Sequence, residues 1–100
     1  MATNSTALFR GAAATSNTTL YTVPSGRTAI ITNIAVTNTA TSGATFTLNL
    51  NGVAIQSASS LAANTTAYFD LKQVLAATQT ISGSASATSV NFHISGIEVF

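Results

Sequence analysis

Hydrophobic and polar residues alternate along much of this chain, with a period of two that predicts β-strands. The clearest segment spans residues 44–50, where Ala, Phe, Leu and Leu take every second position and Thr or Asn lies between them. Asn51 and Gly52 follow at once, and both tolerate the positive φ of a tight type I′ hairpin. Residues 53–56 are therefore expected to return antiparallel, and residues 57–64 to form a crossover.

Residues 18–38, TTLYTVPSGRTAIITNIAVTN, predict a short strand, a turn and a long strand. Pro24 would set φ at the second position of the turn, with glycine following it. In the long strand, residues 28–38, the alternation places Ile30, Ile34 and Val36 on one face and Ile31 on the other. Apolar residues on both faces indicate a central strand that is covered on both sides at that end.

The second half of the chain continues in the same way. Residues 65–71 alternate, with Tyr68 and Asp70 expected to face outward, and residues 80–85 form a short strand. The segment between them, residues 72–79, has neither the length nor the cap of a helix. It is interpreted as a corner in which Val74 or Leu75 fills the core.

The last strand, residues 90–100, contains a change of parity. Phe92 and Ile94 share one face, and Ile97 and Val99 share the other. A β-bulge at residues 95–96 would bring all four side chains onto the core face.

These elements predict one all-β domain: an antiparallel, jelly-roll-like β-sandwich of about seven or eight short strands, without a significant helix. Residues 18–100 would form the sandwich. Residues 1–17 would form an N-terminal arm that is loose over residues 1–6 and has a candidate first strand at residues 7–10. Leu8 and Phe9 in this arm need cover, either from the domain's own core or from a neighbouring subunit.

Charge is scarce in this chain. Charged residues make up 5% of it, against about 25% in ordinary domains, and the net charge is +1. The charged residues are Arg10, Arg27, Lys72, Asp70 and Glu98. One interpretation is a β surface decorated with Thr, which suits strands because it is β-branched. The other, which we favour because so little charge gives little colloidal repulsion, is permanent assembly into an oligomer or a larger particle.

The same composition argues against several classes of partner. No basic cluster is present to bind nucleic acid, and no apolar run is long enough for a membrane helix. The N-terminus lacks the pattern of a secretory signal. Without cysteine, disulfides and thiolate metal sites are excluded.

Candidate chemistry is sparse as well. His93 is the single histidine, and a catalytic role would require Asp70 or Glu98 to orient it. Residue types and spacings typical of a metal or cofactor site are missing, so we expect no enzyme activity and neither metal nor cofactor. Tyr21 and Tyr68 could pack in a core or an interface, or stack on sugars. Arg27 could be a solvated turn residue or an ion-pair partner at an interface.

The pattern TTLYTVPSGRTAIITNIAVTNT resembles that of small virion proteins of tailed bacteriophages, in which a strand ending Leu-Tyr-Thr-Val-Pro precedes a glycine turn and a long strand. The later hairpin TLNLNG, the segment LAA before a strand ending Asp-Leu, and the terminal ISGIEV fit the same family. The resemblance covers about residues 18–100 and includes no catalytic motif.

This resemblance implies a structural role in a virion, foremost as a capsid decoration (cement) protein on the outer capsid surface. Its partners would be other copies of itself, as a homotrimer, and the major capsid protein or other virion proteins. A neck or tail adaptor or fibre-associated module is one alternative, and a carbohydrate-binding β-sandwich is another. The candidate interface residues are Leu8, Phe9, Arg10, Tyr21, Arg27 and Tyr68.

Overall fold

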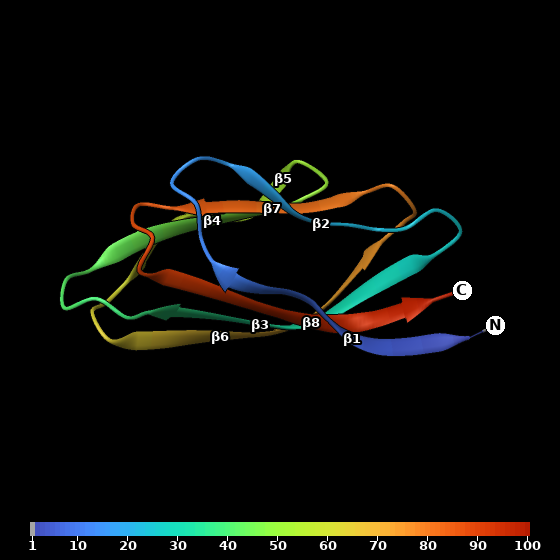
Figure 1. Cartoon of the computed structure of the whole chain (residues 1–100), viewed down its shortest axis with the longest axis horizontal. Helices are drawn as coiled ribbons and strands as arrows, with labels where there is room; N and C mark the ends of the chain where they lie inside the picture. Colours follow the sequence, from blue (N-terminus) through green and yellow to red (C-terminus); the bar gives the residue numbers. More distant parts are fainter. Residues whose placement is uncertain (1) are drawn as a thin grey trace.

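The computed structural model describes residues 2–100, which form two stacked sheets (Figure 1). The strands of this described part are β1 (Thr3–Ala12), β2 (Thr18–Thr22), β3 (Thr28–Asn38), β4 (Ala44–Leu50), β5 (Val53–Leu61), β6 (Thr65–Leu75), β7 (Thr80–Ala85) and β8 (Val90–Val99). One sheet has the order β1-β8-β3-β6 and the other β2-β7-β4-β5, with every neighbouring pair antiparallel. Residues 2–100 contain no helix. The predicted all-β sandwich is confirmed.

The chain wraps back and forth between the two layers. Among the described strands, β4 and β5 are the one consecutive pair that stays in the same sheet, and the Asn51-Gly52 hairpin joins them. Every other connection crosses to the opposite sheet, which is the jelly-roll arrangement. The molecule is elongated, with extents of 46 × 21 × 18 Å, and both termini lie at one end (Figure 1).

Strands β3, β4 and β7 span the residues that the alternation predicts. Asn51 and Gly52 have φ values of 50° and 80°, as the predicted type I′ turn requires. The other turn differs from expectation, because the Arg27 amide donates to the Pro24 carbonyl at 3.2 Å. Pro24 is therefore the first residue of its turn rather than the second, and Gly26, with φ of 80°, is the third.

Three strands are longer than predicted. Strand β1 begins at Thr3, so most of the expected arm belongs to the sheet; Met1 lies outside the described residues. Strand β5 continues to Leu61 through a bulge at Ala58, whose amide bonds the Thr47 hydroxyl at 3.0 Å. Strand β6 continues through the expected corner because β3 supplies pairing partners as far as Leu75.

The predicted bulge within the last strand is wrong. Burial alternates strictly along β8, so Phe92 and Ile94 face the core while Ile97 and Val99 lie on the opposite face. The register shifts lie in the neighbouring strands. Strand β1 has an extra residue opposite Ile94 and Ser95, and β3 has one opposite Ser95 and Gly96. Glycine is required at position 96 beside these bulges, because a β-carbon there would clash with the Ile30 carbonyl oxygen of β3.

The shift in β3 also overturns the predicted faces of that strand. The ladder is irregular between Ile31 and Asn33, which reverses the alternation there. As a result Ile31 is fully buried together with Ile34 and Val36, whereas Ile30 is only partly buried and pairs with Ile97. One sheet face at this end is thus open to solvent.

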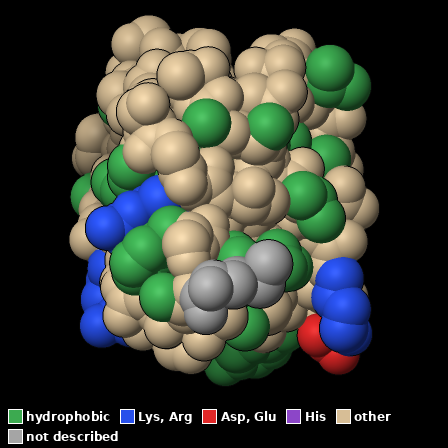
Figure 2. All heavy atoms as spheres, turned by 90° about the vertical axis from the view of Figure 1, so that its right-hand side faces the viewer, with side chains coloured by type: hydrophobic (Ala, Val, Ile, Leu, Met, Phe, Trp, Pro, Cys, Tyr) green, Lys and Arg blue, Asp and Glu red, His purple; other side chains and the backbone are tan. Residues whose placement is uncertain are grey.

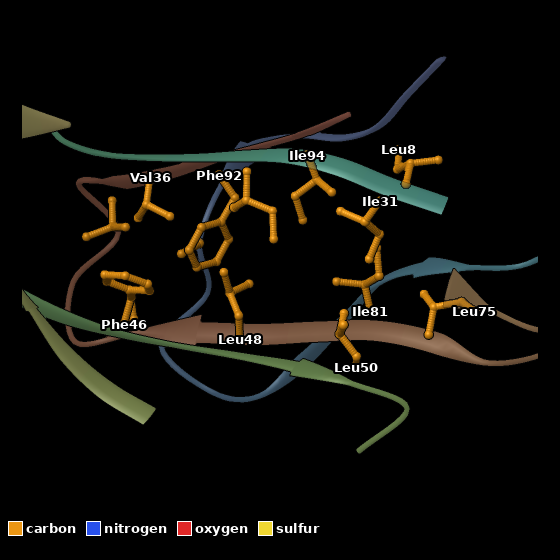
Figure 3. Packing of buried hydrophobic residues seen from close by; sticks show 14 of the residues in the cluster. Leu8, Ile31, Val36, Phe46, Leu48, Leu50, Leu75, Ile81, Phe92 and Ile94 are labelled. Carbon is orange, nitrogen blue, oxygen red and sulfur yellow. The ribbon is translucent and has the colours of Figure 1, made fainter. Parts of the chain in front are cut away.

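The core lies between the two sheets. Side chains from β3 and β8 point toward those from β4 and β7 and interdigitate with them (Figure 3). The Phe46 ring contacts both Phe69 and Phe92, with centroid distances of 6.0 and 6.4 Å in tilted and edge-on arrangements. Leu75 is the residue of the predicted pair that enters the core, whereas Val74 is 65% exposed.

One buried polar side chain organises the loops at one end of the sandwich. Asn38, at the end of β3, is fully buried. Its amide nitrogen donates to the carbonyl of Ser42 at 2.8 Å and, more weakly, to those of Leu61 and Ala62. Its amide oxygen accepts from the Ala40 amide and the Ser89 hydroxyl, each at 3.1 Å. The side chain therefore ties three connections together.

Replacing Asn38 with alanine is expected to lower the free energy of unfolding by about 2–3 kcal/mol, because it strips hydrogen-bond partners from buried backbone groups. Urea denaturation would measure the change. The matched control is Asn33→Ala on the exposed side of the same strand, where we expect a change within about 0.5 kcal/mol. Equal losses in the two variants would contradict the role assigned to Asn38.

Candidate interaction surface

A polar cluster closes the end of the sandwich that carries the termini. Glu98, on the inner face of β8, is buried at 7% exposure. The Tyr21 hydroxyl donates to one of its carboxylate oxygens, and Arg27 Nη1 lies 2.9 Å from the other. The Arg27 guanidinium also sits 3.9 Å from the centre of the Phe100 ring. These contacts link strand β2, strand β8 and the turn before β3.

The cluster shifts the protonation of its members. The Tyr21 hydrogen bond, aided by Arg27 and opposed by burial, holds the pKa of Glu98 below its usual value. Burial, reinforced by the neighbouring Glu98 carboxylate, raises the pKa of Tyr21. Glu98 is therefore ionised and Tyr21 neutral at neutral pH, and the cluster is a hydrogen-bonded clasp within the fold.

The clasp predicts a loss of stability in acid. A lowered pKa in the folded state means that the unfolded chain binds more protons, so the stabilisation is present above the ordinary glutamate pKa of 4.5 and declines as pH falls below it. Glu98→Gln should cost most at neutral pH, and its deficit should shrink on acidification. Urea midpoints at a series of pH values would show this.

The matched control for the clasp is Arg10→Gln, which removes an exposed charge on β1 and leaves both the clasp and the edge strand β6 unchanged. This substitution should change stability little at neutral pH, where Glu98→Gln is costly. A Glu98→Gln deficit that stayed constant down to pH 3 would contradict the ionised clasp.

A second feature is the outer face, which we define as the solvent side of the β1-β8-β3-β6 sheet. The strand register arranges its residues in cross-strand rows: Tyr68, Ala35, His93 and Arg10; Asp70, Asn33, Ser95 and Ala7; and Val74, Ile30, Ile97 and Ser5. Tyr68 is 74% exposed. The central strands β3 and β8 bring no Lys, Arg, Asp or Glu to this face. Figure 2, which looks at the end that carries the termini, shows hydrophobic side chains at the bottom centre, where this sheet lies in Figure 1, with charged side chains to the left and right of them.

A cleft opens between the two sheets along one side of the sandwich. It has a volume of about 340 Å³ and lies between the edge strands β5 and β6. Ile34 and Leu48 form its floor, and Phe69 and Leu71 contribute further apolar surface. Polar groups of β5 and β6, including Gln56 and Gln73, stand at its sides. The sequence alone does not reveal this cleft, because the cleft depends on how far apart the two edge strands lie.

The predicted interface residues fall into three environments. Leu8 is 7% exposed and belongs to the core, and Phe9 is partly buried against it, so the domain itself covers both. Tyr21 and Arg27 meet at Glu98, which makes Arg27 an ion-pair partner within the chain. Arg10 and Tyr68 remain on the surface, at opposite edges of the outer face.

The structure does not assemble the candidate catalytic groups. Glu98 faces the inside of the sandwich, whereas His93 lies on the outer face of the same strand. Asp70 shares the outer face, but β3 lies between its strand and that of His93. Within residues 2–100, no three His, Asp or Glu residues gather as metal ligands would, and no helix could span a membrane.

Together the strand order and the surface define this chain as an all-β jelly-roll sandwich with an exposed sheet face and an open lateral cleft. No protein-family model matches the sequence, and no curated protein matches it significantly.

Proposed function

We propose that this chain is a non-enzymatic structural protein of a virion, foremost a capsid decoration protein that binds the outer capsid surface and stabilises the particle. The observation that carries the proposal is the outer face, whose exposed Tyr68 and Val74 flank central strands without charged side chains. The central strands of this face can be covered by another protein without the cost of burying ions, because the charged residues of the face, Arg10, Asp70 and Lys72, lie on its edge strands β1 and β6. The resemblance of residues 18–100 to small phage virion proteins supports the same role.

A decoration protein works by contacting several capsid subunits at once, so that weak individual contacts add up to a strong attachment. We propose that it does so as a homo-oligomer. A trimer would match three-fold positions on a capsid, and closed symmetry is the rule for homo-oligomers. The low charge supports assembly, because it leaves the free chain with little repulsion between copies.

Immunogold labelling of virions from the source of this chain, with an antibody raised against it, tests the proposal. Label distributed over the head is the expected result. Label confined to the tail would favour the neck or tail alternative. Purified virions that carry no label, while the antibody detects the chain in infected cells, would contradict any virion location.

One observation favours a second candidate, carbohydrate binding. Tyr68 stands exposed next to the cleft, where Gln56, Asp70 and Gln73 offer amide and carboxylate groups to sugar hydroxyls. A glycan array with wild type and Tyr68→Ala would test it. Binding that is lost in the variant would support this function, and an array without signal would remove it.

A further inference from the structure

Strand β6 is an edge of its sheet, and four of its exposed residues are arranged symmetrically about Leu71. Tyr68 and Val74 lie three positions on either side, and Asp70 and Lys72 lie one position on either side. Register partners in β3 place Tyr68, Asp70 and Val74 on the outer face, and alternation adds Lys72. The edge therefore carries an aromatic group, an anion, a cation and an aliphatic group, in that order.

We propose that β6 pairs antiparallel with β6 of a second copy of this chain, about a twofold axis at Leu71. In this register Asp70 lies opposite Lys72 of the second copy, and Tyr68 lies opposite its Val74. Each of these contacts occurs twice, because a twofold interface uses the same patch on both partners. Opposite charges and aromatic-aliphatic pairs are the cross-strand neighbours that stabilise antiparallel sheets.

The strand's own surroundings leave these groups available. The ion pair within residues 2–100 joins Arg27 to Glu98 and does not involve Asp70 or Lys72. Tyr68 and Val74 are 74% and 65% exposed, which makes them two of the most exposed large hydrophobic residues of the described chain. Pairing would bring Tyr68 into contact with Val74 of the second copy and satisfy the outward backbone groups of the edge.

The inner side of β6 supports the same register. Phe69, Leu71 and Gln73 line the cleft beside β5. With the axis at Leu71, the two Leu71 side chains meet, and each Phe69 lies opposite the other copy's Gln73. The apolar mouth of each cleft is then covered by its partner. Strand β5 is less suited to such pairing, because its ladder with β4 is shifted at two places, whereas the ladder of β6 with β3 is shifted at one, opposite Leu71 and Lys72.

A second copy fits this edge better than an unrelated strand does, because the partner must present a cation opposite Asp70 and an anion opposite Lys72, spaced as they are here. The inference is independent of the proposed function. It yields a dimer instead of the trimer expected from capsid symmetry, and it leaves the outer face of both copies open on one continuous sheet.

A charge-swap series measured by sedimentation equilibrium tests the dimer. Wild type should show twice the chain mass of 10.1 kDa. Asp70→Lys and Lys72→Asp should each raise the dissociation constant by about tenfold or more, because each places like charges opposite each other twice. The double variant Asp70→Lys/Lys72→Asp should return to near the wild-type value. Arg10→Glu, on the far edge of the sheet, is the matched control and should leave the mass unchanged.

Disulfide cross-linking tests the proposed register between the two β6 strands. The chain has no cysteine, so Leu71→Cys introduces a single thiol. Residues directly opposite in an antiparallel pair lie within disulfide range, and this variant should therefore form a cross-linked dimer on mild oxidation. Arg10→Cys should not do so at the same concentration.

Four results would overturn the inference: a monomeric wild type at high micromolar concentration, a trimer mass, a double variant no tighter than the single ones, or equal cross-linking from both cysteine positions. Circular dichroism of each variant confirms that the sheet is intact. If sedimentation shows a monomer while the antibody labels virion heads, the dimer alone is refuted. If sedimentation shows a dimer while purified virions carry no label, the proposed function alone is refuted.

Discussion

Gly96→Ala is expected to lower the free energy of unfolding by about 3 kcal/mol or more, a large part of the 5–15 kcal/mol that stabilises an ordinary domain. A β-carbon at this position would lie 2.3 Å from the Ile30 carbonyl oxygen and 3.0 Å from a methyl group of Leu8. The first contact is with backbone in the neighbouring strand β3, so it cannot be relieved by a side-chain rotation. Urea denaturation followed by circular dichroism would measure the loss.

The matched control is Gly43→Ala. A β-carbon there would meet the Leu61 carbonyl oxygen at 3.7 Å, an ordinary contact. We expect the control to stay within about 1 kcal/mol of wild type, since backbone freedom is then the main difference. If Gly96→Ala were as stable as Gly43→Ala, the close approach of β3, β1 and β8 at this level would be wrong.

Phe46→Ala is expected to cost about 3–5 kcal/mol, because it leaves a cavity at the centre of the aromatic contacts between the sheets. The Phe46 side chain is 2% exposed and contacts the rings of Phe69 and Phe92. Figure 3 shows it projecting from β4 toward the opposite sheet. Denaturant midpoints of purified variants would give the difference.

Phe46→Leu provides the graded comparison. It keeps most of the buried volume, and we expect a loss of under about 1.5 kcal/mol. If both variants lost the same free energy of unfolding, the volume of the side chain at position 46 would not matter. That result would contradict the close packing of Phe46 between the sheets.

The alternation of residues was sufficient to predict most strands, because one face of each is buried and the other is not. Strands β3, β4 and β7 and the Asn51-Gly52 hairpin follow from local pattern alone. The predictions fail where a neighbouring strand decides the outcome. The bulges beside Gly96 and the full length of β6 depend on pairing partners that are far away in the sequence.

The candidate surface was less predictable than the fold. Tyr68 was correctly expected to face outward. Arg27 was considered as an ion-pair partner at an interface, but its ion pair lies within the chain. The partner itself, Glu98, could not be chosen from the sequence, because the expected bulge would have reversed the alternation that places it inside. The hydrogen bonds of the buried Asn38 side chain could not be predicted either, because their partners come from three separate loops.

By itself, the sequence determined the fold class of this protein, because a period of two with tight turns yields layered sheets, whatever their order. Only the tertiary structure decided which strands are edges and which groups meet across them. Those features arise from hydrogen bonds and packing between segments that are distant in the sequence. Local sequence propensity does not specify the geometry of such contacts. The symmetric edge of β6 depends on both the sequence and the tertiary structure. The sequence provides its symmetric residues, and the fold leaves them exposed at the edge of a sheet.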